Sequence, residues 1–515
     1  MVFSSYGFLF GFLPMVLAGA YALARIREDR IVVVYFLVGA SLFFYAYWDY
    51  RLVWVMVVSI LFNYFVGRVI ARRSPQPRVV LILGIAANLA LLAYFKYTNF
   101  FVENIGALTG ADLQSATIIL PIGISFFTFH QIAYLVEVNR GNMPSHRLPH
   151  YALFVSFFPQ LIAGPIVYPR ETLPQFVDGR ADWFRAPLFA QGITLLAMGL
   201  AKKVLIADTV AGSATPVFVA AAAGQEPTFI EAWSGALAYT IQVYFDFAAY
   251  SDMAIGLGLL LGVRLPINFM SPYRAHSIIE FWRRWHMTLS RFLRDYLYFS
   301  LGGNRRGKVR QYANLLIVMV LGGLWHGASW TFVLWGFLHG LALAGNHLWR
   351  QFRPRRITPA SPIVGVTAWA TTFLFVVIAW VFFRATTLPA AISMLRGMAG
   401  LNGVVVPETY RQYLGVTADI VTKMGVQFAW MPLFSGLREI AVIGLLLGAC
   451  WWLPNSIEIV GYRGPAATQD RVRRRRPISA LRWRPNAAWA AATAILISVC
   501  ALNMFETGAF LYFQF

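Results

Sequence analysis

A histidine stands inside the apolar run LGGLWHGASWTFVLWG, residues 321–336. Burying an imidazole in hydrocarbon costs free energy, so His326 needs either a partner or a function. Burial favours the neutral imidazole, which is the form that accepts a proton as a general base. The adjacent Gly322, Gly323 and Gly327 permit close backbone approach or local unwinding. From these residues alone, catalysis and a structural hydrogen bond to a neighbouring helix are equally supported.

A second histidine, His286, lies in the basic segment NFMSPYRAHSIIEFWRRWHMTLSRFLRDYLYFSLGGNRRGKVRQY, residues 268–312. Apolar residues recur at helical spacing over 278–296 while arginines occupy other faces, which predicts an amphipathic helix at the cytoplasmic interface. Arg283 and Arg284 either face lipid headgroups or hold the phosphates of a nucleotide-like donor. Taken by itself, His286 is better explained as an interfacial residue with a backbone partner.

Four further ionisable residues interrupt apolar stretches, namely Asp246 and Asp252 in QVYFDFAAYSDMAIGLG and His130 and Glu137 in PIGISFFTFHQIAYLVEVNRG. Charged groups at membrane depth require partners. Structural pairing is the predicted role of both aspartates, with the arginines of 283–294 as candidate partners. His130 is predicted to be a packed or pairing residue rather than a catalytic one.

The composition places these residues in a membrane protein. The chain has 515 residues, of which 58% are hydrophobic and 13% charged, with a mean hydropathy of +0.60. A spanning helix needs about 20 apolar residues, so we expect an all-α, polytopic protein with about 11–13 crossings. The candidate spans are 7–24, 31–49, 52–70, 79–96, 116–136, 188–210, 229–262, 313–345, 363–384, 438–454 and 487–505. Of these, 229–262 and 313–345 are long enough for two passes or for a pass with a re-entrant piece.

The net charge of +21 is concentrated in short runs, among them ARRSPQPR at 71–78, RQFRPRR at 350–356 and RVRRRR at 471–476. These runs flank apolar spans, so we interpret them as cytoplasmic anchors and not as a nucleic-acid surface. This orientation places both termini and the long loop 386–437 outside. The apolar segment 151–169 is broken by prolines and a glycine, which is tolerated at membrane depth only where protein or a cavity surrounds it.

The domain organisation predicted is one membrane-embedded unit, residues 1–515. Its core motifs occupy 116–345, a basic interfacial helix occupies 271–310, and less typical spans occupy 386–515. The two cysteines, Cys450 and Cys500, indicate neither a disulfide framework nor a metal cluster. No bound metal or resident cofactor is expected.

Several motifs of this chain occur together in one known family. PIGISFFTFHQIAYLVEVNRG, FFPQLIAGPIVYP, QVYFDFAAYSDMAIGLG, FWRRWHMTLSRFLRDYLYFSLGGNRRG and GGLWHGASWTFVLWGFLHG resemble the membrane-bound O-acyltransferase family, in particular its bacterial alginate O-acetylation branch. MVFSSYGFLF and LLAYFKYTNFF at 91–101 also resemble that branch. The resemblance extends over residues 1 to about 385. It departs from the family at His130 and Gln131, where relatives usually carry other residues.

The resemblance implies helices around a central tunnel that joins a cytoplasmic funnel to the outer face. It implies that His326, in the LWHG motif, is the catalytic residue, and that His286, in WRRWH, supports it near the cytoplasmic entrance. Arg283, Arg284 and Trp325 are the expected substrate-binding residues. His326 would remove a proton from an acceptor hydroxyl as it attacks an acyl thioester, or would itself be acylated.

The same resemblance implies partners and a location. A cytoplasmic donor such as acetyl-CoA would bind the basic 271–310 surface, and the acetyl group would cross the bacterial inner membrane. It would then reach a periplasmic acetyltransferase that modifies an exported polysaccharide, with alginate as the first candidate. The alternatives are acetylation of cellulose or peptidoglycan, D-alanyl transfer to teichoic acid and, outside this class, a polysaccharide-export transporter subunit. Against the transporter, the breaks at 159–165 and 322–327 do not fall in matching halves.

Overall fold

The computed structural model describes residues 1–26, 30–72, 75–111, 118–177, 185–352, 361–465, 479–504 and 510–511. Most of these residues lie in helices, as predicted, and the described strands form a single two-stranded sheet. The predicted basic run at 471–476 and most of the run at 350–356 lie outside the described residues.

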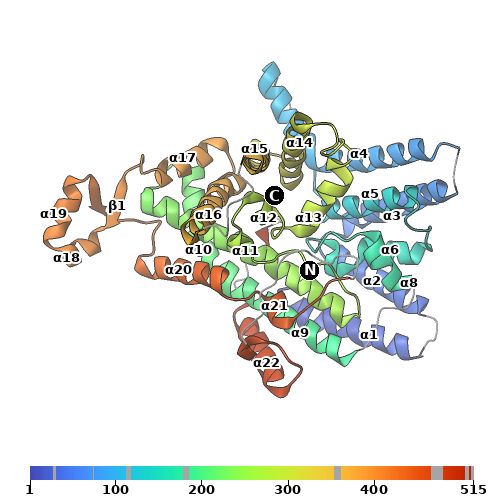
Figure 1. The fold of residues 1–515 in the computed structure, drawn as a ribbon. Helices are drawn as coiled ribbons and strands as arrows, with labels where there is room; N and C mark the ends of the chain where they lie inside the picture. The colour runs from blue at the N-terminus through green and yellow to red at the C-terminus, as the bar shows by residue number, and fades with distance from the viewer. Residues whose placement is uncertain are drawn as a thin grey trace.

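The N-terminal part is a layer of long helices, seen in blue and cyan in Figure 1. Its elements are η1 (Gly7–Phe12), α1 (Leu13–Ile26), α2 (Ile31–Ala46), η2 (Tyr50–Leu52), α3 (Val53–Ala71), α4 (Pro77–Thr109) and α5 (Ile124–Asn139). Helix α4 continues beyond the predicted end at residue 96. The predicted start of the next span, residue 116, lies outside the described residues. Residues 118–123 are not helical, and α5 begins at Ile124, after Gly123 with its positive φ of 71°.

Polar side chains join the three helices α3, α4 and α5 inside this layer. Gln131 of α5 accepts a hydrogen bond from Ser59 of α3 at 2.7 Å and another from Asn63. Asn63 in turn donates to Asn88 of α4 at 3.0 Å. All four side chains are buried. Hydrogen bonds between polar side chains hold helices together where lipid supplies no hydrophobic drive, and Gln131 serves that purpose here.

The broken segment at 151–169 has the predicted character. It forms the short helices α6 (Leu148–Ser156), α7 (Phe158–Leu161) and α8 (Pro169–Val177), with irregular backbone between the last two. Residues 163–168 of that irregular stretch are all buried. The interrupted backbone is therefore enclosed by protein, as its interruption required.

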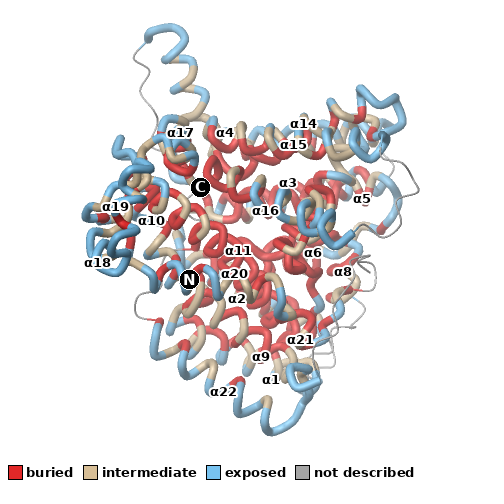
Figure 2. The backbone as a smooth tube through the Cα atoms, turned by 60° about the vertical axis from the view of Figure 1, so that its left-hand side comes forward, coloured by how far each residue is buried: buried red, intermediate tan, exposed pale blue. Residues whose placement is uncertain are grey.

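Helix α11 (Phe229–Leu260) runs through the centre of the molecule (Figure 1). It packs against α9 (Ala186–Ala201), η3 (Lys202–Ala207) and α10 (Asp208–Ala222). Its spanning window is entirely buried, and Figure 2 shows it in red across the middle of the fold. The capping box of Thr228 and Glu231 fixes its start. Two passes within 229–262 were one option, and that option is wrong because the helix is continuous.

The basic segment does not form the single amphipathic helix that its periodicity predicts. It contains η4 (Pro272–Arg274), α12 (Ile278–Trp282), α13 (Met287–Phe292) and η5 (Leu293–Tyr298). The break between α12 and α13 falls at His286, whose φ of 39° is left-handed. The apolar residues keep their helical spacing in the sequence across the break, but the backbone is not helical there.

The segment 313–345 forms two helices, which is one of the predicted options. They are α14 (Lys308–His326) and α15 (Trp330–Phe352), and α16 (Pro362–Arg384) packs beside α15. Glycines bring α14 and α15 together. A side chain at Gly336 would strike the backbone of Met319, and one at Gly323 would strike the carbonyl of Phe332. The predicted close approach is confirmed at Gly323, while unwinding there is wrong because α14 stays helical to His326.

The C-terminal part continues with α17 (Leu388–Met398), β1 (Val404–Pro407), η6 (Glu408–Tyr410), α18 (Arg411–Leu414), α19 (Val416–Lys423), β2 (Val426–Ala429), α20 (Leu437–Trp452), α21 (Ser456–Val460), η8 (Ser479–Leu481) and α22 (Ala487–Leu502). Strands β1 and β2 pair in parallel, with Val404 opposite Val426. Together with α18 and α19 they project from the helical body at the left of Figure 1.

Six helical segments among the described residues are long and apolar enough to cross a membrane. They are Gly7–Ile26, Tyr50–Ala71, Pro77–Thr109, Ala186–Ala222, Phe229–Leu260 and Pro362–Arg384, and Ile31–Ala46 and Ala487–Leu502 are shorter apolar helices. The chain is therefore a multi-pass membrane protein. The total of about 11–13 crossings and the orientation stay predictions.

Candidate active site

His326 is the last residue of α14, at the point where the chain turns toward α15. Gly327 has an extended backbone (φ −156°) that ends the helix, and a side chain there would collide with the ring of Phe332. The glycine therefore permits the tight turn that carries His326.

The imidazole of His326 is buried in an aromatic surround. Its ring centroid lies 4.8 Å from that of Trp325, 5.1 Å from Phe383 and 5.4 Å from Trp335. Its Nδ1 atom is buried without a hydrogen-bond partner among the described residues. This nitrogen is therefore free to exchange a proton with a bound substrate, and the catalytic role of His326 stays a prediction.

His286 lies beside His326, 6.3 Å away between ring centroids. It is buried within the protein, and its predicted position at the cytoplasmic interface stays a prediction. Backbone hydrogen bonds on both sides hold its left-handed conformation: Met270 donates to Arg284 O, and Met287 donates to Asn268 O, each at 2.9 Å. A left-handed residue with a side chain costs about 1–2 kcal/mol, which these contacts must offset. The two predicted histidines are therefore brought into one site.

The other three predicted residues occupy different surroundings. Arg284 forms an ion pair with Glu280 at 2.8 Å and donates to Met270 O at 3.1 Å. Arg283 is exposed. Trp325 is buried, and its indole stacks on Phe129 with a centroid separation of 5.1 Å. The donor-binding role of these residues stays a prediction.

Sequence reasoning missed two residues that hold the end of α14. Lys96 of α4 donates to Trp325 O at 2.6 Å and to His326 O at 3.0 Å, and Tyr97 donates to Leu324 O at 3.0 Å. The available signal was a lysine within the apolar stretch LLAYFKYTNFF, since an ionisable residue in a span calls for a functional explanation.

Comparison with known proteins identifies the family of this site. The family model of the membrane-bound O-acyltransferases matches residues 40–388, a range that contains both histidines and Lys96. The chain belongs to the membrane-bound O-acyltransferase family.

Three relatives show how far the similarity extends. A probable alginate O-acetylase of Pseudomonas aeruginosa is 40% identical, with 100% of each chain covered. A peptidoglycan O-acetyltransferase of Helicobacter pylori is 44% identical over 78% of this chain and 81% of its own length. A teichoic acid D-alanyltransferase of Streptococcus thermophilus is 29% identical over 44% of this chain and 57% of its own length. The chain is accordingly an O-acyltransferase, and the transporter alternative is wrong.

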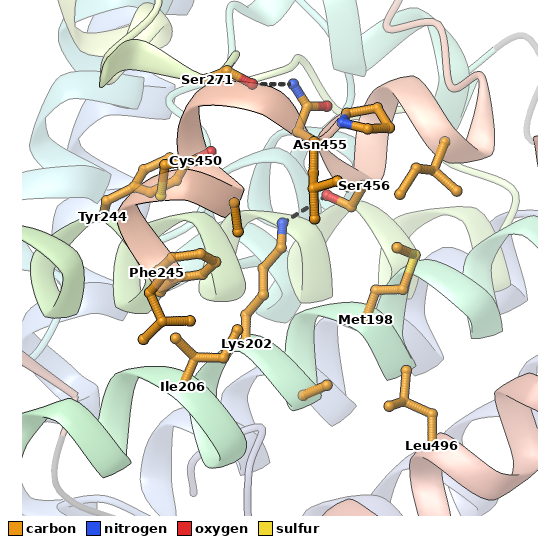
Figure 3. A pocket seen from close by; sticks show the side chains of 16 residues that line it. Met198, Lys202, Ile206, Tyr244, Phe245, Ser271, Cys450, Asn455, Ser456 and Leu496 are labelled. Atoms are coloured by element: carbon orange, nitrogen blue, oxygen red, sulfur yellow. Dashed lines mark hydrogen bonds between the residues drawn. The ribbon is translucent and has the colours of Figure 1, made fainter. Parts of the chain in front are cut away.

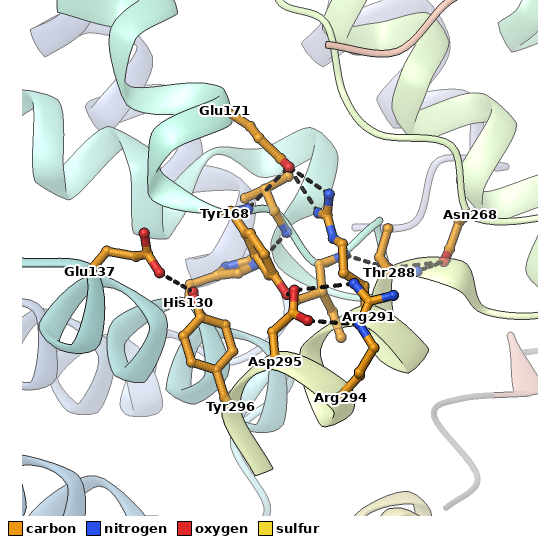
Figure 4. Close-up of polar contacts among 12 residues, drawn as sticks. His130, Glu137, Tyr168, Glu171, Asn268, Thr288, Arg291, Arg294, Asp295 and Tyr296 are labelled. Atoms are coloured by element: carbon orange, nitrogen blue, oxygen red, sulfur yellow. Dashed lines mark hydrogen bonds and ion pairs between the residues drawn. The ribbon is translucent and has the colours of Figure 1, made fainter. Parts of the chain in front are cut away.

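Two arginines that follow His286 in this acyltransferase, Arg291 and Arg294, contact carboxylates (Figure 4). Arg291 donates two hydrogen bonds to the buried Glu171, at 2.5 and 2.9 Å, and its guanidinium lies 4.0 Å from the centroid of the Tyr168 ring. Arg294 contacts Asp295 at 2.7 Å. Bidentate pairing of this kind fixes geometry, so Arg291 joins α13 to α8.

The two membrane aspartates pair with lysines, so the predicted arginine partners are wrong. Asp246 lies 2.9 Å from Lys203, and Asp252 lies 2.5 Å from Lys202. Figure 3 shows Lys202 reaching toward Ser456 at the wall of a cavity of about 270 Å³. The lining of that cavity includes neither His326 nor His286. The predicted structural pairing of both aspartates is confirmed.

The remaining predicted positions also have structural contacts. His130 is buried and its Nε2 accepts a hydrogen bond from the backbone of Val167 at 3.4 Å, so its packed role is confirmed. Glu137 accepts hydrogen bonds from Asn142 at 2.9 Å and Tyr296 at 3.2 Å. Among the described residues, no group of three or more histidine, cysteine or acidic side chains could hold a metal ion.

Proposed function

We propose that this O-acyltransferase is the membrane component of a polysaccharide O-acetylation system, and that its polymer is alginate. The observation that carries the proposal is the similarity to a probable alginate O-acetylase over 100% of both chains. The alginate relatives of Pseudomonas putida and Azotobacter vinelandii are 43% and 45% identical over 85% and 77% of this chain. The buried His326–His286 pair supplies a site suited to acyl transfer.

The proposed reaction starts from acetyl-CoA at the cytoplasmic face. An acceptor hydroxyl attacks the thioester carbonyl while its proton passes to His326, which acts as general base. The C–S bond breaks, a C–O ester bond forms, and the departing thiolate takes up the proton. The His286 ring, whose centroid lies 6.3 Å from that of His326, forms the adjacent side of the site. Arg283 and Arg284 supply positive charge for the phosphates of the donor.

The proposed location is the bacterial inner membrane, in contact with membrane lipid. The acetyl group passes to a periplasmic acetyltransferase partner, which esterifies the exported polymer. No nucleic acid takes part in this scheme, and no resident cofactor is needed because the thioester itself supplies the activated acetyl group.

Peptidoglycan is the second candidate acceptor. The peptidoglycan O-acetyltransferase is 44% identical to this chain, within the 40–45% identity of the alginate relatives, but its match covers 78% of the chain against 100% for the Pseudomonas aeruginosa alginate relative. D-alanyl transfer is less well supported, because the two teichoic acid relatives are 29% and 26% identical over 44% and 55% of this chain.

Complementation tests the acceptor directly. The chain is expressed in a Pseudomonas aeruginosa strain that lacks its own alginate O-acetylase, and ester-linked acetate is measured on the secreted alginate and on purified peptidoglycan. We expect acetate to return to alginate and to leave peptidoglycan unchanged. Acetate on peptidoglycan alone would replace alginate by the second candidate. A protein that accumulates in the membrane and restores neither ester would overturn both.

A further inference from the structure

Helix α14 ends without the usual means of satisfying its last carbonyls. An α-helix leaves four C-terminal C=O groups without intrahelical partners, and a left-handed residue just after the helix commonly satisfies them. Gly327 occupies that position but is extended, with φ −156° and ψ 146°. The backbone of Gly327 donates only to Gly323 O, at 3.3 Å. The carbonyls of Leu324, Trp325 and His326 must find partners elsewhere.

All three carbonyls find these partners on α4, more than two hundred residues earlier in the chain. Lys96 bridges Trp325 O and His326 O, and Tyr97 donates to Leu324 O. The Lys96 Nζ atom also lies at the C-terminal end of the α14 dipole. It lies 6.0 Å from the centre of the Trp325 ring.

The same part of α4 holds the start of α15. Trp330 donates from Nε1 to Asn104 Oδ1 at 2.8 Å, and its ring lies 5.8 Å from that of Phe100. The turn that carries His326 is thus attached to α4 on both sides. In Figure 1 the light-blue end of α4 extends past α14 and α15.

We propose that Lys96 is a positioning residue for His326. Its ammonium holds the last two carbonyls of α14 and so fixes where the imidazole stands relative to the donor thioester and the acceptor hydroxyl. This proposal rests on the proposed function, because it takes His326 as the base. Displacing a catalytic group by about 1 Å costs on the order of 10²-fold in rate. Without Lys96, two buried carbonyls lose their partners and the last turn of α14 unwinds.

The test compares Lys96→Met, Lys96→Arg and Tyr97→Phe with Thr98→Val as the matched control. Thr98 lies on the same helix, and its hydroxyl bonds only back to Tyr94 O within that helix. Inverted membrane vesicles that contain the acetylation partners receive labelled acetyl-CoA, and label in the polymer is measured per quantified protein. Polymer acetate from whole cells is a second readout, in which the cell supplies its own acetyl donor and no acetyl-CoA is added.

We expect Lys96→Met to lower kcat by about 10²-fold while the KM for acetyl-CoA stays unchanged, because Lys96 acts through carbonyls and not through substrate. Lys96→Arg should recover most of the activity, since a guanidinium also donates several hydrogen bonds. Tyr97→Phe removes one carbonyl contact and should have a smaller effect. Combining Lys96→Met with His326→Gln should add no further loss, because residues that act as a unit are non-additive.

Three results would overturn the positioning role: a wild-type rate for Lys96→Met, a change confined to KM, or an arginine variant as inactive as methionine at normal abundance. If Lys96→Met fails to accumulate in the membrane, Lys96→Arg and Tyr97→Phe decide the question by their own rates. Failure of the proposed function has a different signature, because His326→Gln would then be active or the wild type would acetylate no polymer.

Discussion

Replacing His326 with glutamine separates catalysis from structure. The glutamine side chain is close in length and can form hydrogen bonds, but it does not accept and release a proton near neutral pH. Loss of a general base typically costs 10²–10⁴-fold, which corresponds to about 3–5.5 kcal/mol in the transition-state barrier. We therefore expect His326→Gln to lower acetylation by at least about 10²-fold.

The packing of the site shows why the glutamine variant is the sharper probe. The imidazole is enclosed by the rings of Trp325, Trp335 and Phe383 at 4.8–5.4 Å between centroids. His326→Ala would leave a space there and cost about 1–3 kcal/mol if polar groups lose their partners. His326→Gln fills most of that space. Both variants should reach the membrane in normal amounts, and both should be inactive.

The assay is ester-linked acetate on the secreted polymer, from cells in which the only copy of the protein carries the substitution. Abundance in the membrane is measured in the same cells by quantitative immunoblotting. Fully acetylated polymer from cells bearing only His326→Gln would refute the assignment of His326 as the base, since a purely structural histidine can be replaced by another hydrogen-bonding side chain.

Three further predictions follow from the same region. His286→Asn should keep the fold, because asparagine tolerates the left-handed backbone. It should lower activity by about tenfold, or about 1.4 kcal/mol, which is a smaller loss than for His326→Gln. Equal losses in the two variants would place His286 in proton transfer. Gly327→Ala should destabilise the protein by about 1–3 kcal/mol through collision with the adjacent phenyl ring, measured as a lower melting temperature in detergent, whereas Gly345→Ala, with open space around it, should not. Arg283→Ala and Arg284→Ala should each raise the KM for acetyl-CoA by about tenfold, as expected for one charge-assisted hydrogen bond; unchanged KM values would leave these arginines with membrane anchoring only.

The sequence predicts local features of the fold and misses the contacts that assemble the site. Apolar run lengths locate α3 and α16 and leave room for two helices in 313–345, and the prolines of 151–169 locate the break there. Periodicity alone could not find the break at His286, because that conformation depends on pairing with the backbone of Asn268 and Met270. Neighbouring residues also carry no sign that His286 and His326 meet.

The sequence also could not predict the partners of the charged residues. An aspartate in an apolar stretch predicts a cationic partner, and Asp252 does pair with a cation. The arginines close to it in sequence were the predicted partners, whereas the structure pairs it with Lys202. The choice depends on how η3, which follows α9 directly, packs against α11, and helical spacing within either segment does not specify that packing. The partners of Lys96 are backbone carbonyls, which every residue has, so no residue type in the sequence indicates where its side chain binds.

The residues that contact His326 or hold its backbone lie in one part of the chain. Lys96, His286, Trp335 and Phe383 all lie within residues 40–388, the range that the family model matches.

Residues after 388 contact the central helix α11, and they also contact Ser271 and Arg274 of the basic segment. Ser456 donates to Asp252, the backbone of Leu511 donates to Asp246 at 2.8 Å, and Glu439 accepts from Ser234. Breaking a buried polar contact of this kind costs about 1–3 kcal/mol, which lowers the population of folded protein without altering the geometry around the imidazole. Substitutions in these contacts with α11 should therefore reduce abundance at constant kcat, whereas those around His326 should reduce kcat at constant abundance.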